Sequence, residues 1–215
     1  MPDIDASYFR HLYAQGDDPW GYRTRWYEQR KRALAAACLP DRRYASGFEP
    51  GCAGGDLAAV LAPRCERYLA ADLDPTAVQA ASRLLAPIAH ARVLQLSLPE
   101  GWPTATRFDL VVLSELGYYL GADGLAQVAR QARQSLALNS ARGGASGAGW
   151  PEGGVVLACH WRHPIEGCDL DGDAVDEVLH QHLQLPRLLR HEEADFVLSV
   201  WATDGRSVAA REGLA

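Results

Sequence analysis

A glycine-rich turn lies between an apolar strand and a helix in the first third of the chain. It runs Phe48-Glu-Pro-Gly-Cys-Ala-Gly-Gly-Asp-Leu57. Glycines let the backbone approach a ligand closely, and the helix that follows directs its first unpaired N–H groups into the same space. Asp72 ends the next strand, 21 residues after Gly51, where a carboxylate can accept from both hydroxyls of a ribose. Together these features predict a site for a nucleoside cofactor.

The residues around the glycines favour a cationic cofactor over a dinucleotide. The turn lacks the GxGxxG pattern whose third glycine a pyrophosphate needs, and Glu49 stands two residues before the first glycine. A carboxylate at this point repels a pyrophosphate but can hold an ammonium group. An adenosine ligand with an amino-acid tail and a sulfonium charge therefore suits the turn better than NAD. An NAD-linked oxidoreductase stays an alternative.

Polar residues also end the fourth and fifth predicted strands, at the edge where ligands bind in open α/β sheets. Glu115 follows Ser114 there and could orient a substrate amine or shield a positive cofactor. Alternatively, Ser114 caps a helix that carries Glu115 in its first turn. His160 ends the fifth strand and is a candidate general base, because imidazole accepts a proton near neutral pH.

Aromatic and basic residues next to these positions are candidates for contact with a substrate. Tyr118 and Tyr119 are either core aromatics or the floor of an acceptor pocket. Trp161 and Arg162 follow His160 directly, and Arg162 could position an anionic or hydroxyl-rich substrate.

The elements that must position these residues alternate between short apolar strands and amphipathic helices. This alternation predicts a parallel sheet covered on both faces, which right-handed crossovers make an open, doubly wound sheet. Helices are predicted over Gly55–Leu61, Pro75–Leu85 and Gly124–Leu138. Strands are predicted over Tyr44–Glu49, Tyr68–Asp72, Arg92–Leu96, Phe108–Ser114, Val155–His160, Leu188–His191 and Phe196–Thr203.

Three segments depart from this alternation. The link between the last two strands is too short for a crossover helix, so these strands should form an antiparallel hairpin at one edge of the sheet. Asn139–Gly154 consists mostly of Gly, Ala and Ser and is predicted to be a flexible inserted loop. The segment at 205–215 has little apolar periodicity and is expected to be frayed.

The first 40 residues are rich in aromatic and basic side chains. Two helices are predicted, at Asp5–Ala14 and Thr24–Cys38, with the turn-forming residues 16–21 between them. We expect Arg30, Lys31 and Arg32 to form a solvated face of the second helix.

Composition limits the classes of partner. The chain has 215 residues, of which 48% are hydrophobic and 22% charged, as in one ordinary globular domain. Its formal net charge of −6 provides no basic surface for nucleic acid. Neither a membrane span nor a signal peptide is apparent. We therefore expect a cytoplasmic protein that acts on a small molecule, in an oligomeric state that the sequence does not predict.

Cysteine and histidine spacing argues against a metal site. The five cysteines are odd in number and never spaced as CxxC, which is typical of reduced thiols in a cytoplasm. A histidine trio is the remaining possibility, which we do not favour because its members lie away from the predicted ligand edge: His180, His182 and His191.

The sequence resembles a known class of enzymes. Glu49–Gly55 resembles motif I of the class I S-adenosylmethionine-dependent methyltransferases, with Ala53 in place of the middle glycine, and Asp72 matches the acid that holds the ribose in that class. Over roughly residues 7–203, the chain is similar to the nodulation protein S family, bacterial N-methyltransferases that act on a sugar amine. Four segments carry this similarity: Asp18–Tyr22, Tyr27–Lys31, Val112–Tyr119 and His160–Pro164.

The resemblance implies a set of residues around S-adenosylmethionine. The turn residues line its methionine part, Glu49 receives its ammonium and Asp72 its ribose, with Leu73 against the adenine. Ser97 stands where this class often has an acid that binds the adenine amino group. The N-terminal helices imply a lid, although their aromatic residues could also simply staple them to the sheet. The full set is Glu49, Gly51, Cys52, Gly55, Asp72, Leu73, Ser97, Leu98, Ser114, Trp20 and Tyr22.

The resemblance also implies a fold and a reaction. The fold is a Rossmann-like, doubly wound, mostly parallel seven-stranded sheet with an antiparallel edge hairpin and an N-terminal helical lid. Within this single domain we expect a lid at 1–40, a core at 41–204 and a tail at 205–215. The reaction is direct, in-line transfer of a methyl group to an amine of a sugar or other small metabolite, with Glu115 and His160 as the catalytic candidates. The alternatives are a small-molecule O-methyltransferase and a protein that binds the cofactor without catalysis.

Overall fold

A single seven-stranded sheet forms the centre of the computed structural model, which describes residues 6–16, 18–136 and 153–215. Its strands are β1 (Tyr44–Pro50), β2 (Cys65–Asp72), β3 (Ala91–Gln95), β4 (Leu110–Ser114), β5 (Val155–Trp161), β6 (Arg187–Glu192) and β7 (Phe196–Ala202). They lie in the order β3-β2-β1-β4-β5-β7-β6. The predicted sheet is therefore confirmed, with the strand ends shifted by a few residues.

The direction of the strands sets the position of the ligand edge. β1 to β5 are parallel, whereas β7 runs antiparallel to β5 and β6 in the predicted edge hairpin. β2 and β3 lie on one side of β1, and β4 and β5 lie on the other. Because the strand order reverses between β1 and β4, a crevice opens beyond their carboxyl ends, where open α/β sheets bind ligands.

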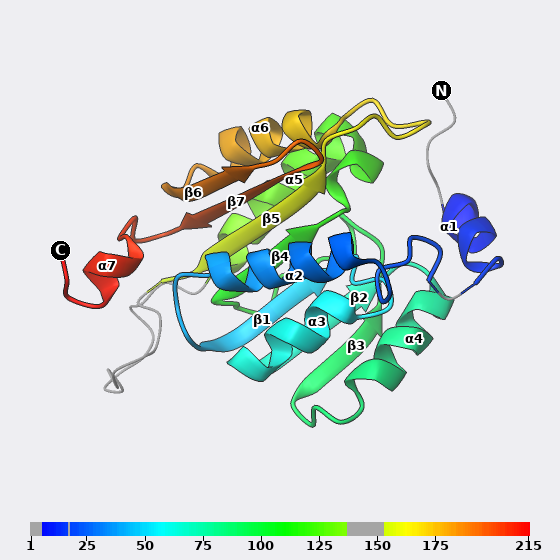
Figure 1. The fold of residues 1–215 in the computed structure, drawn as a ribbon, viewed down its shortest axis with the longest axis horizontal. Helices are drawn as coiled ribbons and strands as arrows, with labels where there is room; N and C mark the ends of the chain where they lie inside the picture. Colours follow the sequence, from blue (N-terminus) through cyan, green and yellow to red (C-terminus); the bar gives the residue numbers. More distant parts are fainter. Residues whose placement is uncertain (1–5, 17, 137–152) are drawn as a thin grey trace.

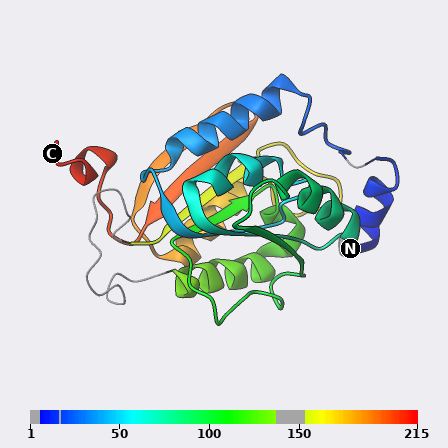
Figure 2. The same cartoon turned by 90° about the horizontal axis from the view of Figure 1, so that it is seen from below.

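Helices cover both faces of the sheet. α2, α3 and α4 lie on one face, and α5 and α6 on the other (Figure 1). Figure 2 shows α2 (blue) and α5 (light green) on opposite sides of the strands. The helices are α1 (Ala6–Tyr13), α2 (Trp26–Cys38), α3 (Asp56–Leu61), α4 (Pro75–Leu85), α5 (Gly121–Ser135), α6 (Gly172–Leu183) and α7 (Val208–Arg211), with short 3-10 turns η1 (Ala62–Arg64) and η2 (Gly117–Leu120).

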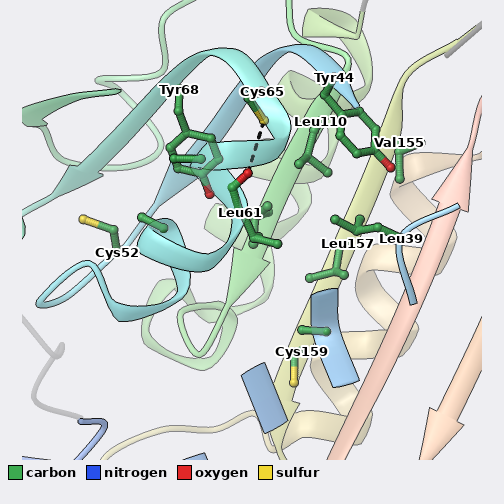
Figure 3. Packing of buried hydrophobic residues seen from close by; sticks show 14 of the residues in the cluster. Leu39, Tyr44, Cys52, Leu61, Cys65, Tyr68, Leu110, Val155, Leu157 and Cys159 are labelled. Atoms are coloured by element: carbon green, nitrogen blue, oxygen red, sulfur yellow. Dashed lines mark hydrogen bonds between the residues drawn. The ribbon is translucent and has the colours of Figure 1, made fainter. Parts of the chain in front are cut away.

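The two layers explain why the central strands are continuously apolar. In β4, Leu110 and Val112 pack into the cluster beneath α2 and α3, and Val111 and Leu113 pack into the cluster beneath α5 and α6. Figure 3 shows the first cluster, in which Leu110 lies beside residues of β1, β2 and β5. A strand buried on both faces needs apolar side chains in both directions, which a run such as Leu-Val-Val-Leu provides.

Some expectations need correction. The segment after Gly205 contains α7, and the side chain of Arg211 from this helix packs against Asp41, with Nη1 3.0 Å from Oδ1. One arginine anchors the segment, so apolar periodicity could not reveal it. α5 begins at Gly121, one turn before the predicted start. Most of the predicted loop Asn139–Gly154 lies outside the described residues. Among the helices of the described part, none is long and apolar enough to cross a membrane.

Gly47 in β1 gives a test of the packing beneath α3. A Cβ at this position would lie 2.6 Å from Cδ2 of Tyr68 on the neighbouring strand. We expect Gly47→Ala to lower the free energy of unfolding by about 1–3 kcal/mol, because neither side chain has room to move in the core. Urea denaturation followed by circular dichroism measures the change.

Gly124 in α5 provides the matched control. A Cβ there would meet only Cβ of Leu120, at an ordinary 3.5 Å. Gly124→Ala should therefore raise the free energy of unfolding by about 0.5–1 kcal/mol, the usual gain from alanine inside a helix. Equal stability of the Gly47→Ala variant and the wild type would contradict the packing described for β1 and β2.

Candidate active site

A cavity of about 390 Å³ lies at the carboxyl ends of β1, β2 and β4. The strand ends form one wall, and α1, the residues at 20–22 and α2 form the other. Of the predicted cofactor residues, all but Gly55 line it. Glu115 and Tyr119 from the predicted catalytic and substrate groups line it as well. The cavity has the size and mixed lining of a small-molecule site.

The glycine turn bends closely around the end of β1. Gly51 has a φ of +69°, and a Cβ there would lie 3.2 Å from Cβ of Leu116. The backbone N–H of Cys52 donates to the carbonyl of Ala71 at 2.9 Å, which ties the turn to β2. Gly55 has a different role, because a Cβ there would lie 3.1 Å from Cα of Ala81. It allows α3 to approach α4 and does not line the cavity.

Glu49 places a buried carboxyl group beside this turn. Only 3% of the residue is exposed, and the hydroxyl of Tyr68 donates to Oε2 at 2.5 Å. Burial raises the pKa of Glu49 to about 8, although the hydrogen bond from Tyr68 opposes the shift. A buried carboxyl group of this kind holds a proton at neutral pH until a cation reaches it. It could therefore hold the ammonium of a ligand.

Two backbone N–H groups, one from the glycine turn and one from the residues after β2, fix the carboxylate of Asp72. Its Oδ2 accepts from the N–H of Ala53 at 2.9 Å, and its Oδ1 accepts from the N–H of Asp74 at 3.0 Å. Burial raises the pKa of Asp72, and these two N–H groups offset part of the shift. Asp72 thus stands rigidly at the end of β2, where a carboxylate could hold ribose hydroxyls.

The part of the cavity lining next to Asp72 is mostly apolar, and we call this part the apolar slot. It is formed by residues that follow β2 and β3, and the side-chain amide of Gln95 fixes its wall by donating to the carbonyl of Leu73 at 3.0 Å. A flat aromatic base could be held between such side chains. The slot residues are Leu73, Leu96, Ser97 and Leu98.

Lys31 does not lie on a solvated face, contrary to the expectation from the sequence. Its side chain is 7% exposed and lies between two carboxylates, with Nζ 2.6 Å from Oε1 of Glu115 and 3.0 Å from Oε2 of Glu28. Burial alone would lower the pKa of Lys31, but these carboxylates, Glu115 foremost, raise it. Lys31 and Glu28 both line the cavity, so they are site residues that the sequence did not predict.

The neighbours of Lys31 also have partners. Arg30 points to the outside of α2 and pairs with Glu193 at 2.7 Å. Arg32 donates to the carbonyl of Tyr22 at 2.6 Å and lines the cavity. The available sequence signal was the spacing of 28, 31 and 35, which places these residues on one face of a helix. A Glu–Lys pair at this spacing is usually solvent-exposed, so the pattern alone did not show that this face is buried.

Glu115 is held in place from three directions. Its backbone has a φ of +56°, and Oε1 accepts from Lys31. Oε2 accepts from the Tyr118 hydroxyl and from the N–H of Trp161. Burial would raise the pKa of Glu115, but the charge of Lys31 and these donors hold it below its ordinary value. The alternative with Ser114 as a helix cap does not hold, since η2 begins at Gly117 without a side-chain cap.

The structure does not bring His160 to the cavity, which corrects its expected role as a general base. The residue is 1% exposed, and Nε2 accepts from the N–H of Gly117 at 3.1 Å. Burial lowers the pKa of His160 to about 4 despite the nearby charge of Glu115. A neutral imidazole whose acceptor nitrogen is already used positions η2 rather than accepting a substrate proton.

Three predicted substrate residues also lie outside the cavity lining. Tyr118 is a core aromatic whose hydroxyl serves Glu115. Trp161 packs edge-on against Tyr27, with ring centroids 5.6 Å apart. Arg162 pairs with Asp173 at 2.8 Å and with Glu192 at 3.0 Å. The partners of Trp161 and Arg162 lie on other elements of the fold, α2, α6 and β6, and a single sequence does not show such partners.

The N-terminal aromatic residues close the open side of the cavity. Trp20 stacks on Tyr22 with centroids 5.5 Å apart, and Tyr13 meets Trp20 edge-on at 5.6 Å. Asp18 stabilises this turn by accepting from the N–H of Tyr22 at 2.8 Å. Phe9 and Tyr13 line the cavity in addition to the two aromatics expected there. These side chains can exclude water from the space above the strand ends.

No metal centre is found among the residues that the structure describes. No group of three or more His, Cys, Asp or Glu side chains in this part of the chain could hold an ion. His180 accepts from the indole of Trp201, and His191 pairs with Glu193. All five cysteines are free thiols.

The fold and site define the class of protein. A doubly wound sheet with an antiparallel edge hairpin, a glycine turn after β1 and an acid at the end of β2 are the features of the class I S-adenosylmethionine-dependent methyltransferase fold. Within this class, a sequence model of the family "Nodulation protein S (NodS)" matches residues 8–136. The chain belongs to the nodulation protein S family.

Comparison with individual proteins agrees with this assignment. Nodulation protein S from Bradyrhizobium diazoefficiens is 33% identical over 105 residues, which are 48% of this chain and 50% of that protein. The chain thus spans about half the length of the curated relatives that it matches. A crystal structure from Pseudomonas syringae, assigned to the methyltransferases, is 42% identical, with a TM-score of 0.67, and the match covers 83% of this chain and 99% of that one.

The fold is also shared with a ligand-bound relative. The N-methyltransferase NodS from Bradyrhizobium japonicum, crystallised with S-adenosyl-L-homocysteine, superposes with a TM-score of 0.71 at 20% identity. This match covers 91% of the present chain and 96% of that chain. The predicted family and fold are confirmed.

Replacement of Lys31 tests whether the ion pairs beneath α2 are buried. We expect Lys31→Met to lower the free energy of unfolding by about 3–5 kcal/mol at pH 7, because it leaves two buried carboxylates without a counter-ion. The pKa of Glu115 is lower in the folded than in the unfolded chain. Its contribution to the free energy of unfolding is therefore fully present at pH values above its unfolded pKa and is lost as the pH falls through its folded pKa. The difference between wild type and variant should therefore shrink between pH 7 and about pH 3.

Arg30→Met is the matched control for this measurement. It removes the neighbouring ion pair of α2, which is screened by solvent, and should lower the free energy of unfolding much less than Lys31→Met does. Urea unfolding at the two pH values gives both differences. A cost for Lys31→Met no larger than for Arg30→Met would contradict the buried triad.

Proposed function

We propose that this protein transfers a methyl group from S-adenosylmethionine to an amine of a sugar or of another small metabolite. The observation that carries the proposal is the pair of carboxyl groups on either side of the glycine turn, Glu49 and Asp72, in one cavity with an apolar slot. Family membership and the methyltransferase neighbours support the same reading.

The residues present fit this cofactor part by part. Glu49 is a buried acid whose raised pKa falls when a cation binds, so it suits the ammonium of the methionine portion. Asp72 faces the cavity and is already fixed by two backbone N–H groups, which suits it to ribose hydroxyls. Leu73 and Leu98 line the slot and can enclose the adenine. When bound, the cofactor supplies an electrophilic methyl group on a positively charged sulfur.

The residues around the acceptor contribute position and charge. Glu28, Lys31 and Glu115 line the part of the cavity between α2 and the end of β4, with Tyr119 beside them. The cavity lining as a whole holds more acidic than basic side chains, and this excess attracts a cationic amine more strongly than a neutral hydroxyl. Holding the amine in line with the methyl group supplies much of the rate enhancement, because the reactants no longer have to meet by diffusion.

We further propose a cytoplasmic location and a small-molecule partner rather than a nucleic acid. Five free thiols support a reducing compartment. The formal net charge of −6 is unsuited to a phosphate backbone.

Calorimetric titration with S-adenosylhomocysteine, and with NAD as the control, tests the cofactor. Micromolar affinity for S-adenosylhomocysteine alone is expected. Incubation with methyl-labelled S-adenosylmethionine and a panel of amines, amino sugars and hydroxyl compounds then tests the acceptor class, and label should appear on amines. Binding of NAD alone, or of neither ligand by folded protein, would overturn the proposal. Label on hydroxyl compounds only would show that the methyl acceptor is a hydroxyl group and not an amine.

The pKa of Glu49 predicts a pH-dependent affinity for S-adenosylhomocysteine. The free carboxyl group, with a pKa of about 8, must lose its proton before it can pair with the ligand's ammonium. The dissociation constant should therefore fall by up to about tenfold per pH unit as the pH rises from 6 toward 8. Calorimetry in two buffers of different ionisation enthalpy should show proton release on binding.

Two variants separate this effect from a general loss of affinity. Glu49→Gln should bind more weakly at pH 8 and lose most of the pH dependence. Asp72→Asn should bind more weakly at every pH and keep the slope. A wild-type affinity that does not change between pH 6 and pH 8 would contradict the role of Glu49.

A further inference from the structure

An amine acceptor raises a proton problem that the cavity has to solve. An ammonium nitrogen has no lone pair, so the acceptor must become neutral before it can form a bond to carbon. The group that takes the proton has to line the acceptor end of the cavity. His160 does not, because it is buried behind η2 with Nε2 already engaged. The carboxylates at this end are Glu28 and Glu115.

Glu115 is poorly suited to this step. Lys31, the Tyr118 hydroxyl and the N–H of Trp161 all donate to its two oxygens. Protonation would remove the partner of a buried ammonium, and the pKa of this carboxyl lies below its ordinary value. A weak base whose oxygens are already engaged cannot readily accept a proton from an amine.

Glu28 differs from Glu115 in each of these respects. It lies on α2, opposite the strand ends, and 8% of the residue is exposed. Among the described residues, its carboxylate has one hydrogen-bonding partner, the Lys31 ammonium, at 3.2 Å from Oε1 and 3.0 Å from Oε2. A carboxylate offers about four acceptor positions, so Glu28 retains some for a ligand. If Glu28 is protonated, Lys31 still has Glu115 as its partner at 2.6 Å.

We propose that Glu28 is the catalytic base that takes the proton from the acceptor ammonium, and that Lys31 and Glu115 position it. The inference rests on the proposed function. One proton passes from the acceptor's ammonium to a Glu28 oxygen, giving a neutral amine and a neutral carboxylic acid. The amine nitrogen then forms the bond to the methyl carbon, and the electron pair of the broken carbon–sulfur bond stays on sulfur. The product leaves as a methylated ammonium, and Glu28 returns its proton to water.

The surroundings of Glu28 are consistent with this role. Burial raises its pKa, and the charge of Lys31 offsets the shift only in part, so the carboxylate is a stronger base than usual. The charged groups that act on it are Lys31, Arg32 and Glu115. Three further titratable groups face Glu28 from the residues before α2, from α2 and from β5, in this order: Tyr22, Tyr27 and Cys159. Burial raises the pKa of each, so all three are neutral near pH 7.

Glu28→Gln provides the direct test, because glutamine keeps the shape and can still accept from Lys31 but cannot take up a proton. With the amine acceptor from the panel above, kcat should fall by about 100-fold or more. The wild-type inflection of kcat with pH should disappear, whereas the affinity for S-adenosylhomocysteine should stay the same. Glu28→Asp should retain the inflection at a lower rate.

Two variants with the same chemical change serve as controls. Glu193→Gln removes the Arg30 ion pair on the outside of α2, so it reports what a loosened helix alone does to kcat. Glu115→Gln changes the other carboxylate bound to Lys31 and should keep the pH inflection. Circular dichroism and S-adenosylhomocysteine binding establish that each variant is folded.

A measurement on the wild type does not depend on any variant's activity. In protein labelled with ¹³C at the glutamate carboxyl and saturated with S-adenosylhomocysteine, the Glu28 signal should titrate above its ordinary pKa. Titration at or below that value would overturn the proposal, as would wild-type turnover in Glu28→Gln or an equal loss in Glu193→Gln. If the wild type binds no S-adenosylhomocysteine or methylates no amine, the proposed function itself fails.

Discussion

The gathering of carboxylates around one cavity is the constraint on which this site depends. Among the described residues of the lining, acidic side chains outnumber the basic Lys31 and Arg32; the five acids are Glu28, Glu49, Asp56, Asp72 and Glu115. Buried like charges repel strongly in a low-dielectric interior, so each acid must be protonated, hydrogen-bonded or paired. The remaining negative charge makes the cavity a better host for cations than for phosphates. A sulfonium cofactor and a protonated amine both meet this requirement.

The fold brings these acids together through its topology. Each of the strand-end acids lies in or directly after the last residues of a parallel strand at the same edge of the sheet, and the order reversal between β1 and β4 opens the space between them. α2 closes this space with Glu28 and Lys31 on its inner face. The Lys31–Glu115 ion pair therefore does two things, since it neutralises a buried acid and ties α2 to the end of β4.

The sequence predicted the parts of this arrangement that depend on local pattern. The apolar runs, the glycine turn after β1 and Asp72 at the end of β2 follow from strand periodicity and backbone conformation, which neighbouring residues largely determine. The partner of a polar side chain, in contrast, often belongs to a segment far away in the sequence, and local pattern does not reveal it. Lys31, expected in solvent, is buried because it pairs with Glu115, which lies 84 positions later in the chain. Arg162 pairs with Asp173 and Glu192 and therefore does not reach the cavity. The anchor of α7 was missed for the same reason, since Arg211 binds Asp41 from the other end of the chain.

The two ends of the cavity hold their carboxyl groups in opposite ways. Beside the glycine turn, Glu49 has a neutral hydroxyl as its partner and keeps a raised pKa, so its charge appears only with a bound cation. Between α2 and the end of β4, Lys31 keeps Glu115 ionised, and Glu28 shares the same ammonium at longer distances. Because the Lys31 ammonium stabilises one carboxylate more than the other, the two acids that share it differ in basicity. A difference of this kind between neighbouring acids is what allows one of them to move a proton while the other stays charged and keeps the site in place.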